Sequence, residues 1–125
     1  MTVNKFNNLA ITPEICHLWK EKSPDTVKYL QIVKEYMGPF NTDADDAIRS
    51  VKKCSDCGQL YFYEMLEWRD DDGNDPIYRT IIPVKEAEDA DKLAKLSQFD
   101  VLDHLPQIRY NWPDDAKHPS IFWEK

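Results

Sequence analysis

Residues 59–84 read QLYFYEMLEWRDDDGNDPIYRTIIPV, and this stretch decides the fold that we expect. Its two ends are rich in aromatic and β-branched residues, which favour strands. The polar segment between them contains Gly and Pro and is typical of a connection. The sequence therefore predicts a β-hairpin with a long polar loop. Pro83 should lie at a sheet edge or at a strand end, because proline has no N–H to donate to a ladder.

Helices are expected on both sides of the hairpin. Capping residues followed by apolar residues at helical spacing predict three N-terminal helices, in residues 12–22, 24–37 and 42–51. The segments after the hairpin suggest a helix over 85–96, a shorter helix within 97–105, a third strand at 107–112 and a C-terminus docked through 121–123. We therefore expect one α+β domain, residues 1–125, with N-terminal helices packed on a small antiparallel sheet centred on the 59–84 hairpin.

Charge and composition narrow the classes of partner. Residues 1–42 hold five basic and four acidic residues (+1), and residues 43–125 hold 11 basic and 19 acidic residues (−8), for a net charge of −7. An acidic surface repels phosphate backbones, so we expect no nucleic-acid partner. No segment approaches the roughly 20 apolar residues that span a bilayer, and residues 1–14 lack the pattern of a signal peptide. The expected setting is the cytoplasm, without membrane contact.

Cys54 and Cys57 form the motif in this sequence that most suggests a metal or redox site, Cys-x-x-Cys followed by a glycine. This is the local form of a zinc knuckle, which needs two further ligands. The candidates are Cys16, His17, His104 and His118, and we favour His104 or His118. Cys16 and His17 make a poor pair, because adjacent residues of a helix point about 100° apart. The interpretation that we favour is a plain turn with small buried thiols, and the zinc site and a redox pair are the alternatives. We therefore expect either no cofactor or one structural zinc.

Glu64 is the charged residue on a strand face that should be apolar, since it alternates in register with Leu60, Phe62 and Leu66. A buried carboxylate needs a partner or a raised pKa. Arg79 on the returning strand is the expected partner. The alternatives are a general acid or base, a metal ligand near the cysteines, and a bulge that turns the side chain outward.

The hairpin loop carries the densest acidic run of the chain. It fails the calcium-loop pattern, because aligning Gly73 with the invariant glycine puts Trp68 and Arg79 at ligand positions. We expect it instead to contact a basic protein, which opposite charge would attract. The predicted partner-binding residues are Glu67, Asp70, Asp71, Asp72 and Asp75.

Catalytic motifs are missing from the sequence. It contains no Gly-x-Ser-x-Gly, no His-Glu-x-x-His and only three glycines, which argues against a nucleotide-binding loop. We therefore expect no catalytic residues and no enzymatic activity. A small hydrolase or transferase using Glu64 or His104 is a third alternative.

The segments CSDCGQLYFYE and GNDPIYRTIIPV, within residues 54–84, resemble small bacterial proteins that share this hairpin, some of them immunity proteins encoded beside polymorphic toxins. The resemblance implies a binding role and no catalytic residue. The expected function is an immunity protein that neutralises a cognate toxin by covering its basic active-site cleft. The alternative is a small zinc-stabilised structural or regulatory module without a toxin partner.

Overall fold

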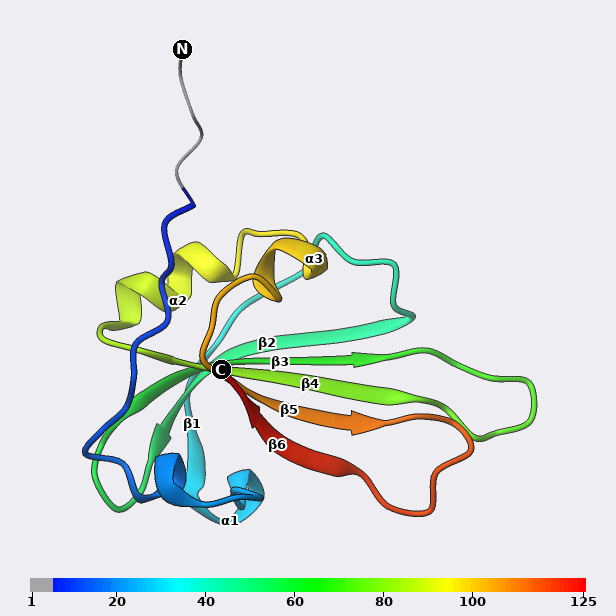
Figure 1. The fold of residues 1–125 in the computed structure, drawn as a ribbon. Coiled ribbons are helices and arrows are strands. Elements are labelled where there is room, and N and C mark those ends of the chain that lie inside the picture. Colours follow the sequence, from blue (N-terminus) through cyan, green and yellow to red (C-terminus); the bar gives the residue numbers. More distant parts are fainter. Residues whose placement is uncertain (1–5) are drawn as a thin grey trace.

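A computed structural model, which describes residues 6–125, shows one antiparallel sheet of six strands (Figure 1). The strands are β1 (Leu30–Glu35), β2 (Asp46–Cys54), β3 (Leu60–Glu67), β4 (Ile77–Val84), β5 (Gln107–Trp112) and β6 (Ser120–Glu124). Each strand pairs with the next one along the chain, so the sheet is a simple meander. The short helices are a 3-10 helix (His17–Lys20), α1 (Thr26–Tyr29), α2 (Ala87–Leu93) and α3 (Gln98–Val101).

The predicted hairpin is confirmed and lies at the centre of the sheet. β3 pairs with β4 from Leu60 opposite Val84 to Glu67 opposite Ile77. Pro83 lies at the end of β4, beyond the part of the strand that pairs with β5. Its carbonyl oxygen accepts a hydrogen bond from the Ile11 N–H at 2.9 Å. The proline therefore costs the ladder no hydrogen bond, as the sequence suggested.

The prediction of an N-terminal helical half is wrong. Residues 12–29 contain only the 3-10 helix and α1, each four residues long, and residues 30–35 form strand β1. Several apolar residues on the predicted helix faces are exposed, namely Ile15 and Val27 (each 76%), Val33 (54%) and Met37 (94%), whereas Leu18 and Leu30 are buried. The helical spacing therefore does not correspond to one buried face.

The segment predicted as a third helix is mostly strand β2, which pairs with β3 from Asp46 to Lys53. Ala47, Ile48 and Val51 fit the helical spacing, but Ile48 and Val51 are β-branched and suit a strand equally well. The long-range ladder to β3 decides between the two, and a local pattern cannot contain it.

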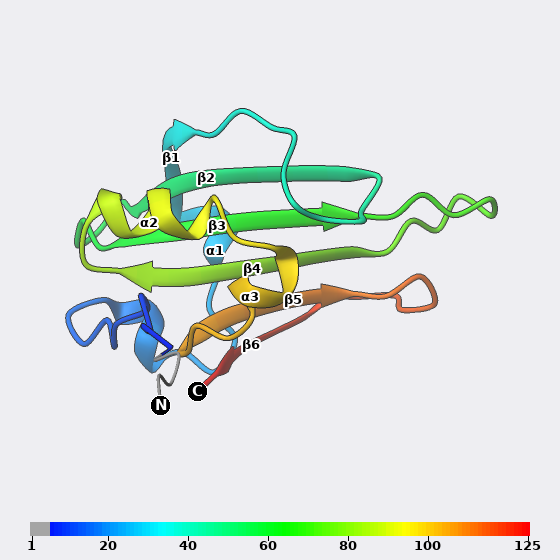
Figure 2. The same cartoon turned by 90° about the horizontal axis from the view of Figure 1, so that it is seen from above.

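Two hydrophobic clusters cover the two faces of the sheet. On one face, β2, β3 and β4 pack against α2 and α3 through Phe62, Ile82, Leu93 and Val101. On the other face, the N-terminal segment contributes Cys16 and Leu18 to a cluster that reaches from β1 to β6. Figure 1 shows α2 and α3 above the strands, and in Figure 2, which looks down from above, they lie in front of the strands. The N-terminal segment thus forms part of the core.

The later segments follow the sequence predictions closely. α2 and α3 lie within the two predicted helices, β5 is the predicted third strand, and the C-terminal residues dock as β6. No helix among residues 6–125 is long and apolar enough to cross a membrane. The expectation about residues 1–14 falls partly on residues 1–5, which lie outside the described part.

β1 is an edge strand with an irregularity. Ile32 pairs with Lys52 and Lys34 with Val51, so the register shifts by one residue at Val33. The extra residue is a β-bulge, which bends the outer strand and increases its twist.

Candidate metal centre

The turn between β2 and β3 positions Cys54 and Cys57. The Gly58 N–H donates to the Cys54 carbonyl and the Cys54 N–H donates to the Gln59 carbonyl, both at 2.9 Å. Gly58 has φ = +80°, a left-handed conformation that glycine adopts without cost. The turn therefore folds back tightly enough to present both cysteines on its inner side.

Cys16 reaches the same place from the N-terminal segment. Its N–H donates to the Pro13 carbonyl at 2.9 Å, and the 3-10 helix begins directly after it. Leu18 is fully buried, and its carbonyl accepts a hydrogen bond from Trp123 Nε1 of β6 at 2.7 Å. With the Ile11–Pro83 hydrogen bond before it, the segment is anchored to the sheet on both sides of Cys16.

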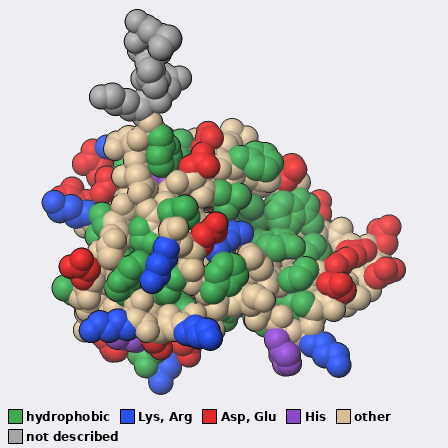
Figure 3. Space-filling view, viewed as in Figure 1, with side chains coloured by type: hydrophobic (Ala, Val, Ile, Leu, Met, Phe, Trp, Pro, Cys, Tyr) green, Lys and Arg blue, Asp and Glu red, His purple; other side chains and the backbone are tan. Residues whose placement is uncertain are grey.

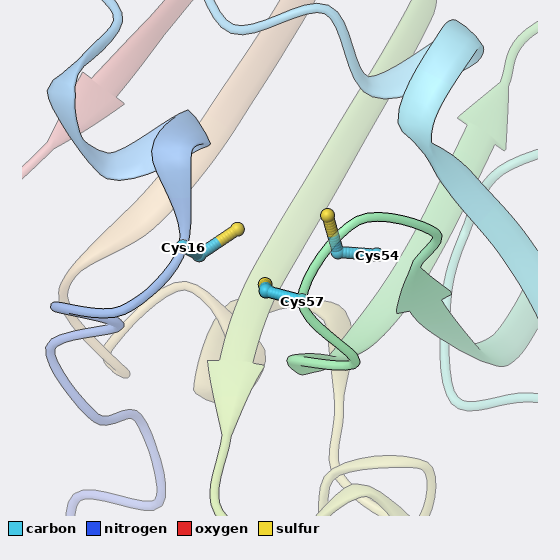
Figure 4. Close-up of side chains that lie close together, drawn as sticks. All are labelled: Cys16, Cys54 and Cys57. Carbon is cyan, nitrogen blue, oxygen red and sulfur yellow. The ribbon is translucent and has the colours of Figure 1, made fainter.

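The three sulfurs converge on one point. They all lie within 4.8 Å of one another, and Figure 4 shows the side chains directed into the space between the N-terminal segment and the turn. Sulfurs bound to one tetrahedral zinc at 2.3 Å would be ~3.8 Å apart. Cys16, Cys54 and Cys57 are therefore close enough to bind a metal ion.

The Cys16 side chain is buried, and its sulfur accepts a hydrogen bond from a buried hydroxyl group. Burial raises the pKa of its thiol to about 12, so the thiol is neutral without a metal. The Tyr61 hydroxyl, itself buried, donates a hydrogen bond to the Cys16 sulfur at 3.0 Å. Such a donor beside a sulfur resembles the outer contacts that orient metal ligands.

The structure does not bring His104 or His118, the expected further ligands, to the sulfurs. His104 follows α3 on the other face of the sheet, where its Nδ1 accepts a hydrogen bond from the Leu9 N–H at 2.9 Å. Burial lowers the pKa of this imidazole. His118 is exposed in the loop between β5 and β6. Cys16, which the sequence named without favouring it, is the ligand that the fold supplies.

Glu64 is buried as predicted, but its partner is not Arg79. Arg49 Nε donates to Glu64 Oε2 at 2.8 Å, and Arg49 Nη2 lies 2.6 Å from the same oxygen. Burial raises the pKa of Glu64 and the Arg49 cation opposes that shift. Arg49 Nη1 also donates to the carbonyls of Ala94 and Leu96, just after α2. Glu64 therefore belongs to a structural ion pair that joins the sheet to α2.

The predicted partner-binding residues lie together on a loop that projects from the sheet. Figures 1 and 3 show the β3–β4 loop extending beyond the body with acidic side chains at its tip. Asp71 and Asp72 are exposed. The Asp75 carboxylate accepts a hydrogen bond from the Asp70 N–H at 2.7 Å, and Glu67 is half-buried. Asp71 and Asp72 are therefore the free charges of the loop.

The structure places further residues beside the β3–β4 loop, at the acidic end of the sheet, that were not predicted from the sequence. Asp45 and Asp46 lie beside the loop, where Asp46 pairs with Arg69 at 3.0 Å and Asp45 accepts from the Arg69 N–H. The loop between β5 and β6 lines a hollow of about 230 Å³ together with residues 73–77, and Trp112 and Asp114 face it. The meander brings these loops together, so only the strand order could have revealed them.

Comparisons with known proteins found no match to this chain. No family model matches the chain, and neither a curated protein nor a solved structure matches it.

Proposed function

We propose that this protein is a small zinc-stabilised module, in which one structural zinc ion fixes the N-terminal segment against the sheet. The convergence of the Cys16, Cys54 and Cys57 sulfurs carries the proposal. Thiolates are preferred ligands of structural zinc, and a site that joins segments far apart in sequence adds binding free energy to the folded state. The residues would serve as ligands only, so the ion has a structural role.

Metal content tests this proposal directly. Protein purified under reducing conditions without added zinc should hold about one zinc per chain. Cys16→Ser, Cys54→Ser and Cys57→Ser should each lower that content, whereas Ser55→Ala, in the same turn, should not. Chelation should lower the free energy of unfolding by about 3 kcal/mol, the size of a cross-link between distant segments. Wild-type protein that neither holds zinc nor takes it up would contradict the proposal.

We further propose that the acidic end binds a basic protein, as an immunity protein binds the toxin that it neutralises. The observation that favours this second function is the grouping of acidic loops around an exposed aromatic side chain. Trp112 is 36% exposed beside the hollow, and buried tryptophans often dominate the binding energy of interfaces. The basic residues in segments 45–46, 67–76 and 113–119 are Arg69 and Lys117. A basic cleft would therefore meet largely opposite charge.

Charge reversal tests the second proposal. Asp71→Lys with Asp72→Lys should lower the association rate with the basic protein that co-purifies with the chain, by roughly tenfold at low salt. These two positions are chosen because their carboxylates make no hydrogen bond within the loop. The matched control is Glu14→Lys, exposed on the N-terminal segment. Stopped-flow rates that do not change at low ionic strength would refute the role of the loop.

A further inference from the structure

We propose that His17 is the fourth ligand of the metal centre, which makes it a Cys3His zinc site. This inference rests on the zinc-stabilised module proposed above and names the ligand that closes it. Structural zinc sites are four-coordinate and closed, so three cysteines leave one position to fill. The expectation that Cys16 and His17 point apart holds only if both residues belong to a helix. Cys16 is in fact extended, with φ = −90° and ψ = 127°, so the two neighbours need not diverge as helical residues do.

The distance to the nearest sulfur supports this assignment. His17 Nε2 lies 4.0 Å from Cys54 Sγ. A nitrogen and a sulfur on one tetrahedral zinc, bound at about 2.05 and 2.3 Å, are ~3.6 Å apart. His17 does not belong to the set whose ligand atoms all lie within 4.8 Å of one another, so its ring must swing inward. The side chain is 36% exposed, which leaves it room to do so.

The other ring nitrogen is already held in the way that metal-binding histidines require. His17 Nδ1 lies 2.9 Å from Glu21 Oε2, one helical turn further along the chain. Once Nε2 releases its contact with Asp56 and gives up any proton there, a carboxylate at Nδ1 would hold the remaining ring proton and leave the lone pair of Nε2 for a metal. The Tyr29 ring packs edge-on against the imidazole, with ring centroids 4.4 Å apart.

Asp56 is the competing group. Its Oδ2 lies 3.2 Å from His17 Nε2, and its side chain is 58% exposed. It belongs to the turn between the two cysteines. This contact occupies the nitrogen in the structure as described, and metal binding would exchange it for the zinc. Asp56 is also the carboxylate that would coordinate if His17 did not.

Zinc X-ray absorption and competition titrations test the assignment. Wild-type protein reconstituted with zinc should show three sulfurs and the multiple scattering of one imidazole. His17→Ala should remove the imidazole signal, keep the three sulfurs and weaken zinc affinity by more than the roughly tenfold expected for Glu21→Gln. His118→Ala is the matched control and should change neither readout. Asp56→Asn should keep the imidazole signal and bind zinc at least as tightly.

The possible outcomes distinguish an error in the assignment of His17 from an error in the proposed zinc-stabilised module. A wild-type spectrum with three sulfurs but no imidazole, or loss of affinity in Asp56→Asn with none in His17→Ala, overturns the assignment of His17 and leaves the zinc-stabilised module intact. Wild-type protein that binds no zinc overturns the proposed module itself, and the assignment with it.

Discussion

Glu64 and Arg49 form a buried ion pair between the neighbouring strands β3 and β2. Alternation along β3 correctly predicted that Glu64 lies on a buried face. The expected partner, Arg79, lies on the opposite face, because Thr80 is the residue across from Glu64. Arg49 lies across from it on the other side, in β2. The segment that contains Arg49 was predicted as a helix. Arg49 could therefore be identified as the partner of Glu64 only from the pairing of β2 with β3.

The buried ion pair predicts how Arg49→Met changes the free energy of unfolding. The change leaves a buried carboxylate without its cation, which should cost about 3–5 kcal/mol of unfolding free energy. Without Arg49, burial raises the folded-state pKa of Glu64 and only the Coulombic attraction of Arg109 still opposes it. A raised carboxyl pKa favours the folded state at acid pH, so the loss should grow as pH rises above 4.5, the ordinary value.

Urea unfolding between pH 4 and 8 measures this effect. Arg49→Met combined with Glu64→Leu should regain part of the stability and lose the added pH dependence, because neither buried charge of the pair remains. A double variant as pH-dependent as Arg49→Met would show that the carboxylate is not the cause.

At the scale of elements, the conformation of the tight turn after β2 depends on one residue, Gly58. Gly58 has φ = +80° and nothing within 4 Å of where a side chain would begin. Any cost of replacing it therefore comes from the backbone and not from a clash.

Gly58→Ala should lower the unfolding free energy of the metal-free protein by about 1 kcal/mol. Gly58→Asn should lose less, because asparagine adopts left-handed conformations more readily. Chemical denaturation of both variants checks this order. If alanine and asparagine are both as stable as glycine, the turn does not need its left-handed residue.

Elements with strong local signals could be predicted, and those decided by distant partners could not. The hairpin, α2, α3 and β5 carry turn residues, caps or alternation within their own segments. β1 and β2 do not, since their apolar spacing fits either a helix or a strand. Their state depends on hydrogen bonds to the neighbouring strands, which only the folded sheet supplies.

At the scale of the whole molecule, the two proposed sites lie at opposite ends of the strands. The cysteines gather where β2 passes into β3, and the acidic loops gather where β3 passes into β4. Half of the metal centre could be predicted, because Cys54 and Cys57 are neighbours in sequence. Cys16 and His17 could not be ranked above His104 and His118, because folding alone brings them to the turn.

The bulge at Val33 bears on how this sheet behaves beside other copies of itself. An edge strand presents unpaired N–H and C=O groups that can template a foreign strand. β1 also exposes Ile32 and Val33, at 57% and 54%, so a straight edge here would invite intermolecular pairing. The extra residue interrupts the row of free hydrogen-bonding groups, and the adjacent Lys34 places a charge in it. An irregular, charged edge of this kind disfavours the pairing of a further strand with β1.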